Sequence, residues 1–234
     1  MKKMRIPGLA VLLLFVASTG FTQQKVGKIV QIVNDVDITS LSSGKKNVPS
    51  IGDEITLDHK IRTGKKSLLE IVLDDGTRLS VREVSVLNIS SLKLAKNDAP
   101  TRIRLLTGKL RVSLKHIFKG DDKSLILKTP TAIAGVRGTD FGAIASPLET
   151  KFIVFDGKVE VASANTSILK SFVLREREET GIKKDQPPIQ PRTVPGEVLK
   201  NWFDYYDISD DNRIIIRGTS EKGLLDRLLR KQDY

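Results

Sequence analysis

The chain has 234 residues, of which 39 are Lys or Arg and 28 are Asp or Glu, so its formal net charge is +11. Hydrophobic residues make up 39% of the chain, a share that excludes a fully disordered protein. The chain has no Cys and only two His, which excludes disulfides, thiolate metal sites, a Cys nucleophile and a His-rich metal site.

The N-terminal residues have the pattern of a secretory signal peptide. A basic stretch at residues 1–5 precedes an apolar stretch at residues 9–17, and small residues follow at 18–20. The apolar stretch is too short to span a membrane comfortably. We therefore expect residues 1–22 to be removed during export. The mature protein is then periplasmic, where it does not ordinarily meet nucleic acid.

Residues 23–165 have the pattern of a β domain. Short runs rich in β-branched residues alternate with glycine turns, and Asp75-Gly76 and Asp156-Gly157 are typical of tight turns. We expect an all-β fold, either a sandwich or a short, irregular β-coil of two facing sheets. The sequence pattern fits both equally well.

A different pattern follows this domain. Residues 166–196 are charged and rich in proline, which predicts an extended segment. Residues 197–234 predict a short helical tail, with one helix at 197–206 and a second, leucine-rich helix at 221–230. The apolar face of the first helix consists of Leu199, Trp202, Phe203 and Tyr206. We expect the tail to pack on the β domain rather than on a partner.

The excess of basic charge is concentrated in residues 93–128, which hold 10 basic and 3 acidic residues. If Thr107-Gly108 form a two-residue hairpin loop, Arg104 lies directly opposite Arg111. One face of that hairpin then carries Arg102, Arg104, Lys109, Arg111 and Lys115. Because like charges repel across a strand pair, this face is either simply solvated or binds an anionic partner. The solvated face is slightly favoured.

The sequence contains no convincing catalytic or metal-binding motif. Carboxylate pairs such as Asp74-Asp75 occupy adjacent positions, which point to opposite faces of a strand. Residues 207–218 resemble the start of a calcium loop, but Asn212 stands where glycine is required and Gly218 where glutamate is required. We therefore expect no enzymatic activity, no metal and no cofactor.

The segment TPTAIAGVRGTDF at residues 129–141 resembles the signature of the FecR domain family. The turns at residues 61–67, 71–79, 106–110 and 154–161 are similar to turns of the family, in the right order, so the resemblance spans about residues 27–165. The motif positions are Thr129, Pro130, Gly135, Arg137, Gly138, Thr139 and Phe141.

This resemblance implies an exported, β-rich domain that binds protein. In the regulator for which the family is named, the periplasmic domain contacts the signalling domain of an outer-membrane TonB-dependent transporter, and a cytoplasmic segment controls a sigma factor. This sequence begins instead with a signal-peptide pattern. Only the envelope-side binding function is therefore expected to carry over.

The residues of the motif themselves favour an architectural role. Gly135 and Gly138 permit tight turns or close approach of strands, and Phe141 has the spacing of a core residue. Arg137 is either a buried charge held by an acidic or carbonyl partner, or a residue that faces a partner protein. The buried structural role is favoured.

These observations together predict an exported, non-enzymatic binding domain. Its expected role is that of a protein-interaction module in envelope signalling or scaffolding. The alternative is a domain that binds an anionic envelope polymer, or the head groups of a glycolipid or other lipid, through the basic β-hairpin.

Overall fold

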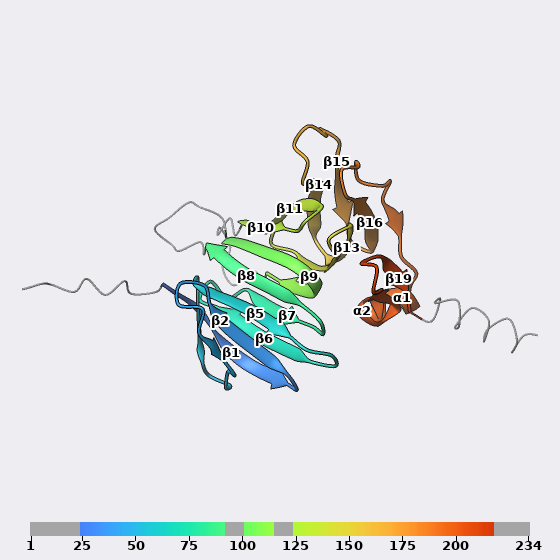
Figure 1. Cartoon of the computed structure of the whole chain (residues 1–234). Coiled ribbons are helices and arrows are strands. Elements are labelled where there is room, and N and C mark those ends of the chain that lie inside the picture. Colours follow the sequence, from blue (N-terminus) through green and yellow to red (C-terminus); the bar gives the residue numbers. More distant parts are fainter. Residues whose placement is uncertain (1–23, 92–100, 115–123, 218–234) are drawn as a thin grey trace, which may run out of the picture.

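The computed structural model describes residues 24–91, 101–114 and 124–217. In these residues, 19 strands and two short helices form an all-β body with a small helical part near the C-terminus (Figure 1). The predicted fold class is confirmed. The expected signal peptide, the expected helix at 221–230 and Lys115 lie outside the described residues.

Of the 19 strands, 17 form two sheets that share β9, and the last two pair with each other in a separate sheet. Every strand pair is antiparallel except β9 with β10. Sheet A contains, in spatial order, β4 (Glu54–Thr56), β1 (Lys25–Val33), β6 (Leu68–Leu73), β7 (Arg78–Val81), β9 (Thr101–Ser113), β12 (Asp140–Ala145), β13 (Glu149–Asp156), β16 (Glu178–Lys183) and β17 (Arg192–Thr193). Sheet B contains β3 (Lys46–Asn47), β2 (Val36–Ser40), β5 (His59–Thr63), β8 (Val86–Ser91), β9, β10 (Ser124–Lys128), β11 (Ala132–Arg137), β14 (Lys158–Ser163) and β15 (Ser171–Arg175).

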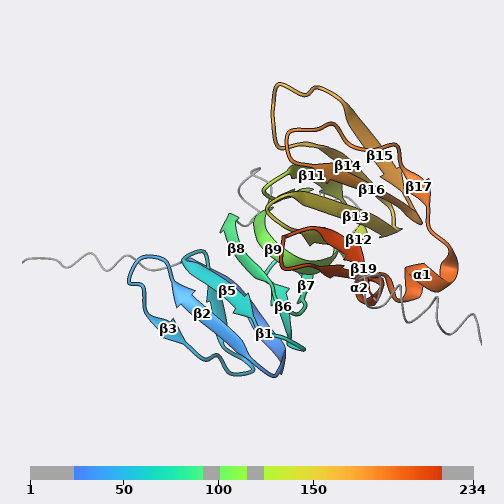
Figure 2. The same ribbon diagram turned by 45° about the vertical axis from the view of Figure 1, so that its right-hand side comes forward.

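The two sheets enclose one hydrophobic core (Figure 2). Successive side chains of a strand point to opposite faces of its sheet, so alternate residues reach the core. In β6, Leu69 and Ile71 are fully buried while their neighbours are partly exposed. Leu87 and Ile103 of sheet B belong to the same cluster. The alternating apolar pattern of the sequence therefore folds as expected.

Strand β9 crosses from one sheet to the other without a break. Its residues 102–107 pair with β8 in sheet B, and its residues 108–113 pair with β7 and β12 in sheet A. The residues of β9 that point into the core have odd numbers before the crossing and even numbers after it. Leu105 and Leu110 are both buried, whereas Leu106 is exposed. Gly108 lies at this change with φ of +102°, a conformation that side chains with a Cβ rarely adopt.

The predicted hairpin at Thr107-Gly108 is wrong. Since β9 continues through these residues, Arg104 lies beside Asn88 and Lys128 in sheet B, whereas Arg111 pairs with residues of β7 and β12 in sheet A. The positive φ that the glycine signal indicated is present, but it bends the strand into the other sheet instead of reversing it. The turn at Gly76, with φ of +81°, does join two paired antiparallel strands, β6 and β7. Gly157, with φ of +91°, is instead a second bend, because it leads from β13 in sheet A into β14 in sheet B.

Both sheets continue beyond residue 165, where the β domain was expected to end. Strand β15 pairs with β14, and β16 pairs with β13. The proline-rich stretch that follows is extended, and β17 within it pairs with β16 at the edge of sheet A. The segment 166–196 therefore adds outer strands to both sheets.

Residues 194–217, which we call the C-terminal segment, cover the outer face of sheet A. This segment contains α1 (Gly196–Lys200), α2 (Trp202–Tyr205), β18 (Tyr206–Ile208) and β19 (Ile214–Ile216). It buries Ile144 of β12 and Ile153 of β13 in a second hydrophobic cluster. Both faces of these strands are thus covered, which explains the continuous apolar run in β12.

The helix expected at residues 197–206 is divided into α1 and α2. Asn201 separates them with non-helical backbone angles, and Tyr206 is already extended. The apolar face was nevertheless placed correctly, since Trp202, Phe203 and Tyr206 are buried against sheet A.

A pair of glycine substitutions tests the crossing of β9. A Cβ at Gly108 would overlap the Cα and Oγ of Ser85, and the positive φ adds backbone strain. We expect Gly108→Ala to lower the free energy of unfolding by about 3 kcal/mol or more. Gly135→Ala is the control, because a Cβ there meets no atom within 4 Å. Its effect should stay within about 0.5 kcal/mol in urea unfolding followed by circular dichroism. Equal stabilities of the two variants would contradict this account.

Candidate interaction site

The C-terminal segment and the outer face of sheet A form a groove of about 280 Å³. Its side chains come from the residue that follows β7 and from β9 and β13 on one side, and from α1 and α2 on the other. The charged and aromatic residues that line it are Arg82, Arg111, Phe155, Lys200, Trp202, Phe203 and Asp204. The groove is therefore a surface that exists only when the C-terminal segment is docked.

Two arginines in the groove are each stacked on a phenylalanine. The Cζ atom of Arg111 lies 4.4 Å from the ring centroid of Phe155, and that of Arg82 lies 5.3 Å from the ring centroid of Phe203. Cation–π contacts of this kind hold a guanidinium over the ring face. Both arginines are therefore positioned by the aromatic rings beneath them.

Each of these arginines also contacts a carboxylate. Arg111 donates to both oxygens of Asp140, from Nε at 2.9 Å and from Nη2 at 2.8 Å. This bidentate contact raises the pKa of the Arg111 guanidinium. Arg82 donates from Nη2 to Oδ1 of Asp204 at 3.3 Å.

A buried carboxylate, Glu179 of β16, anchors the C-terminal segment. Its oxygens accept hydrogen bonds from Trp202 Nε1 at 2.7 Å, from the Tyr206 hydroxyl at 2.9 Å and from Arg192 Nη2 at 2.6 Å. The side chain of Glu179 is only 4% exposed. We call these four residues the Glu179 cluster. Buried polar groups require such partners, so the cluster fixes the segment in one orientation.

The Glu179 cluster changes the ionisation of its members. Burial acts to raise the pKa of Glu179, but the hydrogen bonds from Trp202 and Arg192 and the charge of Lys151 outweigh it, and the pKa is lowered. Burial and the neighbouring carboxylate raise the pKa of Tyr206. Burial lowers the pKa of Lys151, whose Nζ lies 4.7 Å from the ring centroid of Tyr206.

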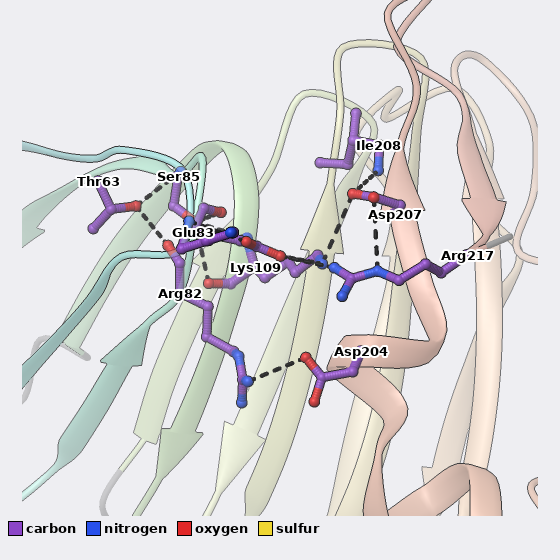
Figure 3. Close-up of polar contacts among 10 residues, drawn as sticks. Thr63, Arg82, Glu83, Ser85, Lys109, Asp204, Asp207, Ile208 and Arg217 are labelled. Atoms are coloured by element: carbon purple, nitrogen blue, oxygen red, sulfur yellow. Dashed lines mark hydrogen bonds and ion pairs between the residues drawn. The ribbon is translucent and has the colours of Figure 1, made fainter. Parts of the chain in front are cut away.

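A second group of charges joins the C-terminal segment to the turn between β7 and β8 (Figure 3). Lys109 of β9 is buried and contacts Glu83 at 3.2 Å and Asp207 at 3.9 Å. Arg217 contacts the same two carboxylates, at 2.8 and 3.7 Å. We call these four residues the Glu83 cluster. Burial acts to raise the pKa of Glu83, but Lys109 and the other donors outweigh it, and the pKa is lowered.

The five basic residues proposed for an anionic partner do not share a face. Arg102 and Arg104 belong to the part of β9 in sheet B. Lys109 is buried in the Glu83 cluster, and Arg111 lies in the groove. Lys115 falls outside the described residues. The basic β-hairpin, and with it the basis for binding an envelope polymer or lipid, is therefore absent from the described structure.

The threonines of the 129–141 motif make buried structural contacts. Thr129 and Thr131 both hydrogen-bond Thr150 of β13, at 2.8 and 2.7 Å. The Thr139 hydroxyl donates to the carbonyl groups of Arg137 and Lys158. These bonds tie the turn between β11 and β12 to β14. The threonines of the motif thus contribute to the architecture.

The remaining motif residues divide into buried and exposed positions. Phe141 is fully buried, and Gly138 has φ of +55°, as a tight turn requires. Pro130 and Gly135 are exposed. The side chain of Arg137 is also exposed, so the expectation that it is a buried charge is wrong. Its position in the strand points it away from the core, as the alternation of β11 requires.

The polar anchors of the C-terminal segment were missed by sequence reasoning. Glu179 and Glu83 lie in charged stretches that look solvated, and their partners are distant in the sequence. One signal was available, because the only Trp of the chain is followed by an acidic residue and two tyrosines. Trp and Tyr carry polar atoms that need partners when they are buried.

The described residues contain no group of three or more His, Cys, Asp or Glu that would hold a metal ion. Within the same residues, no helix is both long and apolar enough to cross a membrane.

Comparison with known proteins identifies the domain. Residues 59–160 match the family model described as FecR protein. These residues are a FecR domain. It runs from β5 into β14 and includes the whole of β9 and the 129–141 motif. The resemblance noted in the sequence is confirmed.

Solved structures extend the likeness beyond the FecR domain. A candidate anti-sigma factor from Parabacteroides distasonis ATCC 8503 has been solved at 2.50 and at 1.65 Å resolution. Each structure is 17% identical in sequence and covers 64% of this chain and 68% of the other, with TM-scores of 0.50 and 0.49. The first shows a shared fold over 64% of this chain. A comparison with curated proteins gives no match.

Substitution of Glu179 tests the anchor of the C-terminal segment. Glu179→Gln removes the charge that three donors share, and we expect a loss of about 2 kcal/mol in unfolding free energy. Trp202 is the only Trp of the chain and is buried, so its emission should shift to the red as the segment loosens and water reaches the indole ring. Glu176→Gln is the control, because Glu176 is exposed and three residues away. Identical emission and stability of both variants would refute the anchoring role.

The lowered pKa values of Glu179 and Glu83 predict a loss of stability in acid. Both lie below the ordinary value of 4.5 in the folded protein, so the folded state binds protons less tightly than the unfolded state. Their stabilisation is complete above that value and is lost as pH falls through the lower, folded values. We expect a steep fall in urea midpoint between about pH 5 and pH 3, and a shallower fall in the Glu179→Gln, Glu83→Gln variant. Parallel pH curves would contradict this.

Proposed function

We propose that this protein is an exported, non-enzymatic protein-binding module that acts in periplasmic signalling. The observation that carries the proposal is the FecR domain at residues 59–160. FecR-type proteins are regulators of the cell envelope, and the signal-peptide pattern of residues 1–22 agrees with that location.

The described structure supports a binding role through its rigid surface. The two sheets share β9 and one continuous core, so they form a single body. The C-terminal segment adds charged and aromatic side chains to one face of this body. Such a scaffold holds a binding surface in place without a large ordering cost on association.

The partner class that the FecR resemblance suggests is an envelope protein. In the namesake regulator that partner is the signalling domain of a TonB-dependent transporter. We propose a protein partner of this kind, either a transporter or an inner-membrane regulator.

Affinity purification from the native organism tests this proposal. The full chain with a C-terminal tag would be expressed at native level, and protein from the periplasmic and membrane fractions would be cross-linked and purified. We expect a mature N-terminus between Phe21 and Lys25, and co-purification of a transporter or an inner-membrane regulator. A strain that expresses the untagged chain is the background control and should recover neither.

Two results would overturn the proposal. The first is a tagged protein found in the cytoplasm with Met1 intact. The second is a correctly exported protein that recovers only lipid or glycan, with no protein above the level of the untagged control.

A further inference from the structure

We propose that the groove between sheet A and the C-terminal segment binds an acidic peptide segment of the partner protein. This inference rests on the proposed protein-binding function and assigns that function a site and a ligand chemistry. The segment would present two carboxylates on either side of an apolar side chain. The argument follows from the charges, the aromatic rings and the size of the groove.

The charge of the groove favours an anion. Three cations line it, Arg82, Arg111 and Lys200, against one carboxylate, that of Asp204. Positive charge is still in excess when Asp140, which holds Arg111 from the side, is counted. Lys200 is exposed on α1 and forms no ion pair with the described residues. Its ammonium is therefore available to an incoming carboxylate.

The two arginines keep hydrogen-bonding capacity for a ligand. A guanidinium has five N–H groups, and Arg111 uses only Nε and Nη2 toward Asp140. Arg82 uses only Nη2, in a single contact with Asp204. Both side chains remain partly exposed, at 45% and 38%. Because the phenylalanine rings already hold the two guanidiniums, little side-chain entropy is lost when they engage a carboxylate.

The remaining lining of the groove favours a peptide over a bare polyanion. Phe155 and Leu199, which are only partly buried, supply apolar surface in the groove. A polyphosphate chain has no apolar group to place against these side chains, whereas a peptide residue such as Leu or Phe does. The volume of about 280 Å³ lies at the lower end for binding clefts, so it suits a few side chains and not a globular domain.

Selection from a display library of short random peptides tests this inference without knowledge of the native partner. The folded, full-length mature protein would be used as bait. We expect the selected peptides to contain two or more Asp or Glu residues near an apolar residue. A synthetic copy of the most enriched peptide would then be titrated while Trp202 emission is recorded, at about 0.1 M and about 1 M salt, where screening differs strongly.

Three variants identify the site. Arg82→Gln with Arg111→Gln removes both stacked guanidiniums, and Lys200→Glu reverses a charge that makes no structural contact with the described residues. Each should lower the affinity for the selected peptide at least about tenfold, because each removes at least one charge-assisted contact with it. Arg78→Gln is the matched control. Arg78 is also a half-exposed arginine of β7 paired with one carboxylate, Glu70, but it lies outside the groove. Its affinity should stay within about twofold of the wild type, because a surface ion pair contributes little.

The outcomes separate the site from the function. If acidic peptides bind the Arg82→Gln, Arg111→Gln variant and the Lys200→Glu variant as tightly as the wild type, the groove is not the binding site. The proposed protein-binding function is unaffected by that result. Selection of neutral or basic peptides overturns the ligand chemistry. If no peptide is selected, while vesicles of anionic phospholipid bind the wild type and not the groove variants, the ligand is a membrane and this inference is wrong. Circular dichroism and Trp202 emission identify any unfolded variant before the titration. If the double arginine variant is unfolded, Lys200→Glu, which disturbs no packing, tests the site.

Discussion

The architecture depends on the passage of one strand, β9, through both sheets. A strand that belongs to two facing sheets must change which of its side chains face inward, and this requires a local departure from the regular pleat. Gly108 provides that departure, because its backbone has a positive φ and lies against Ser85. The hydroxyl of Ser85 accepts a hydrogen bond from the Lys109 amide at the same place. Through this junction β9 contributes buried side chains to the core from both sheets.

The junction also positions the surface on the other side of sheet A. Directly after Gly108, the side chain of Lys109 enters the Glu83 cluster, and that of Arg111 reaches the groove. The C-terminal segment is then held at two points, by the Glu83 cluster near β7 and by the Glu179 cluster near β16. Buried charges in these clusters do not by themselves add much stability, because their desolvation offsets their attraction. Their effect is to allow one docked arrangement and to penalise others.

The sequence predicted the local features well and the long-range features poorly. The tight turn at Gly76, the buried Phe141 and the apolar face of the C-terminal helices depend on residues close together in the chain, and local sequence patterns reveal them. The hairpin at Thr107-Gly108 failed because a glycine with positive φ suits both a reversal and a bend. Only the distant partners of β9, in β8 and β12, distinguish the two. Glu179 was missed for the same reason, since its donors lie 13 to 27 residues further along.

The positions of β1 and β16 show that the FecR match is shorter than the folded unit. The FecR match begins at His59, yet β1 lies between β4 and β6 and contributes the buried Val26 and Ile29 to the core. The match ends at Glu160, yet β16 closes the other side of β13. A fragment cut at the family boundaries would leave β6 and β13 as unprotected edges beside open apolar surface, the arrangement that leads strands of separate molecules to join. The stretch that is recognisable by family is thus smaller than the unit whose strands pair and bury the core.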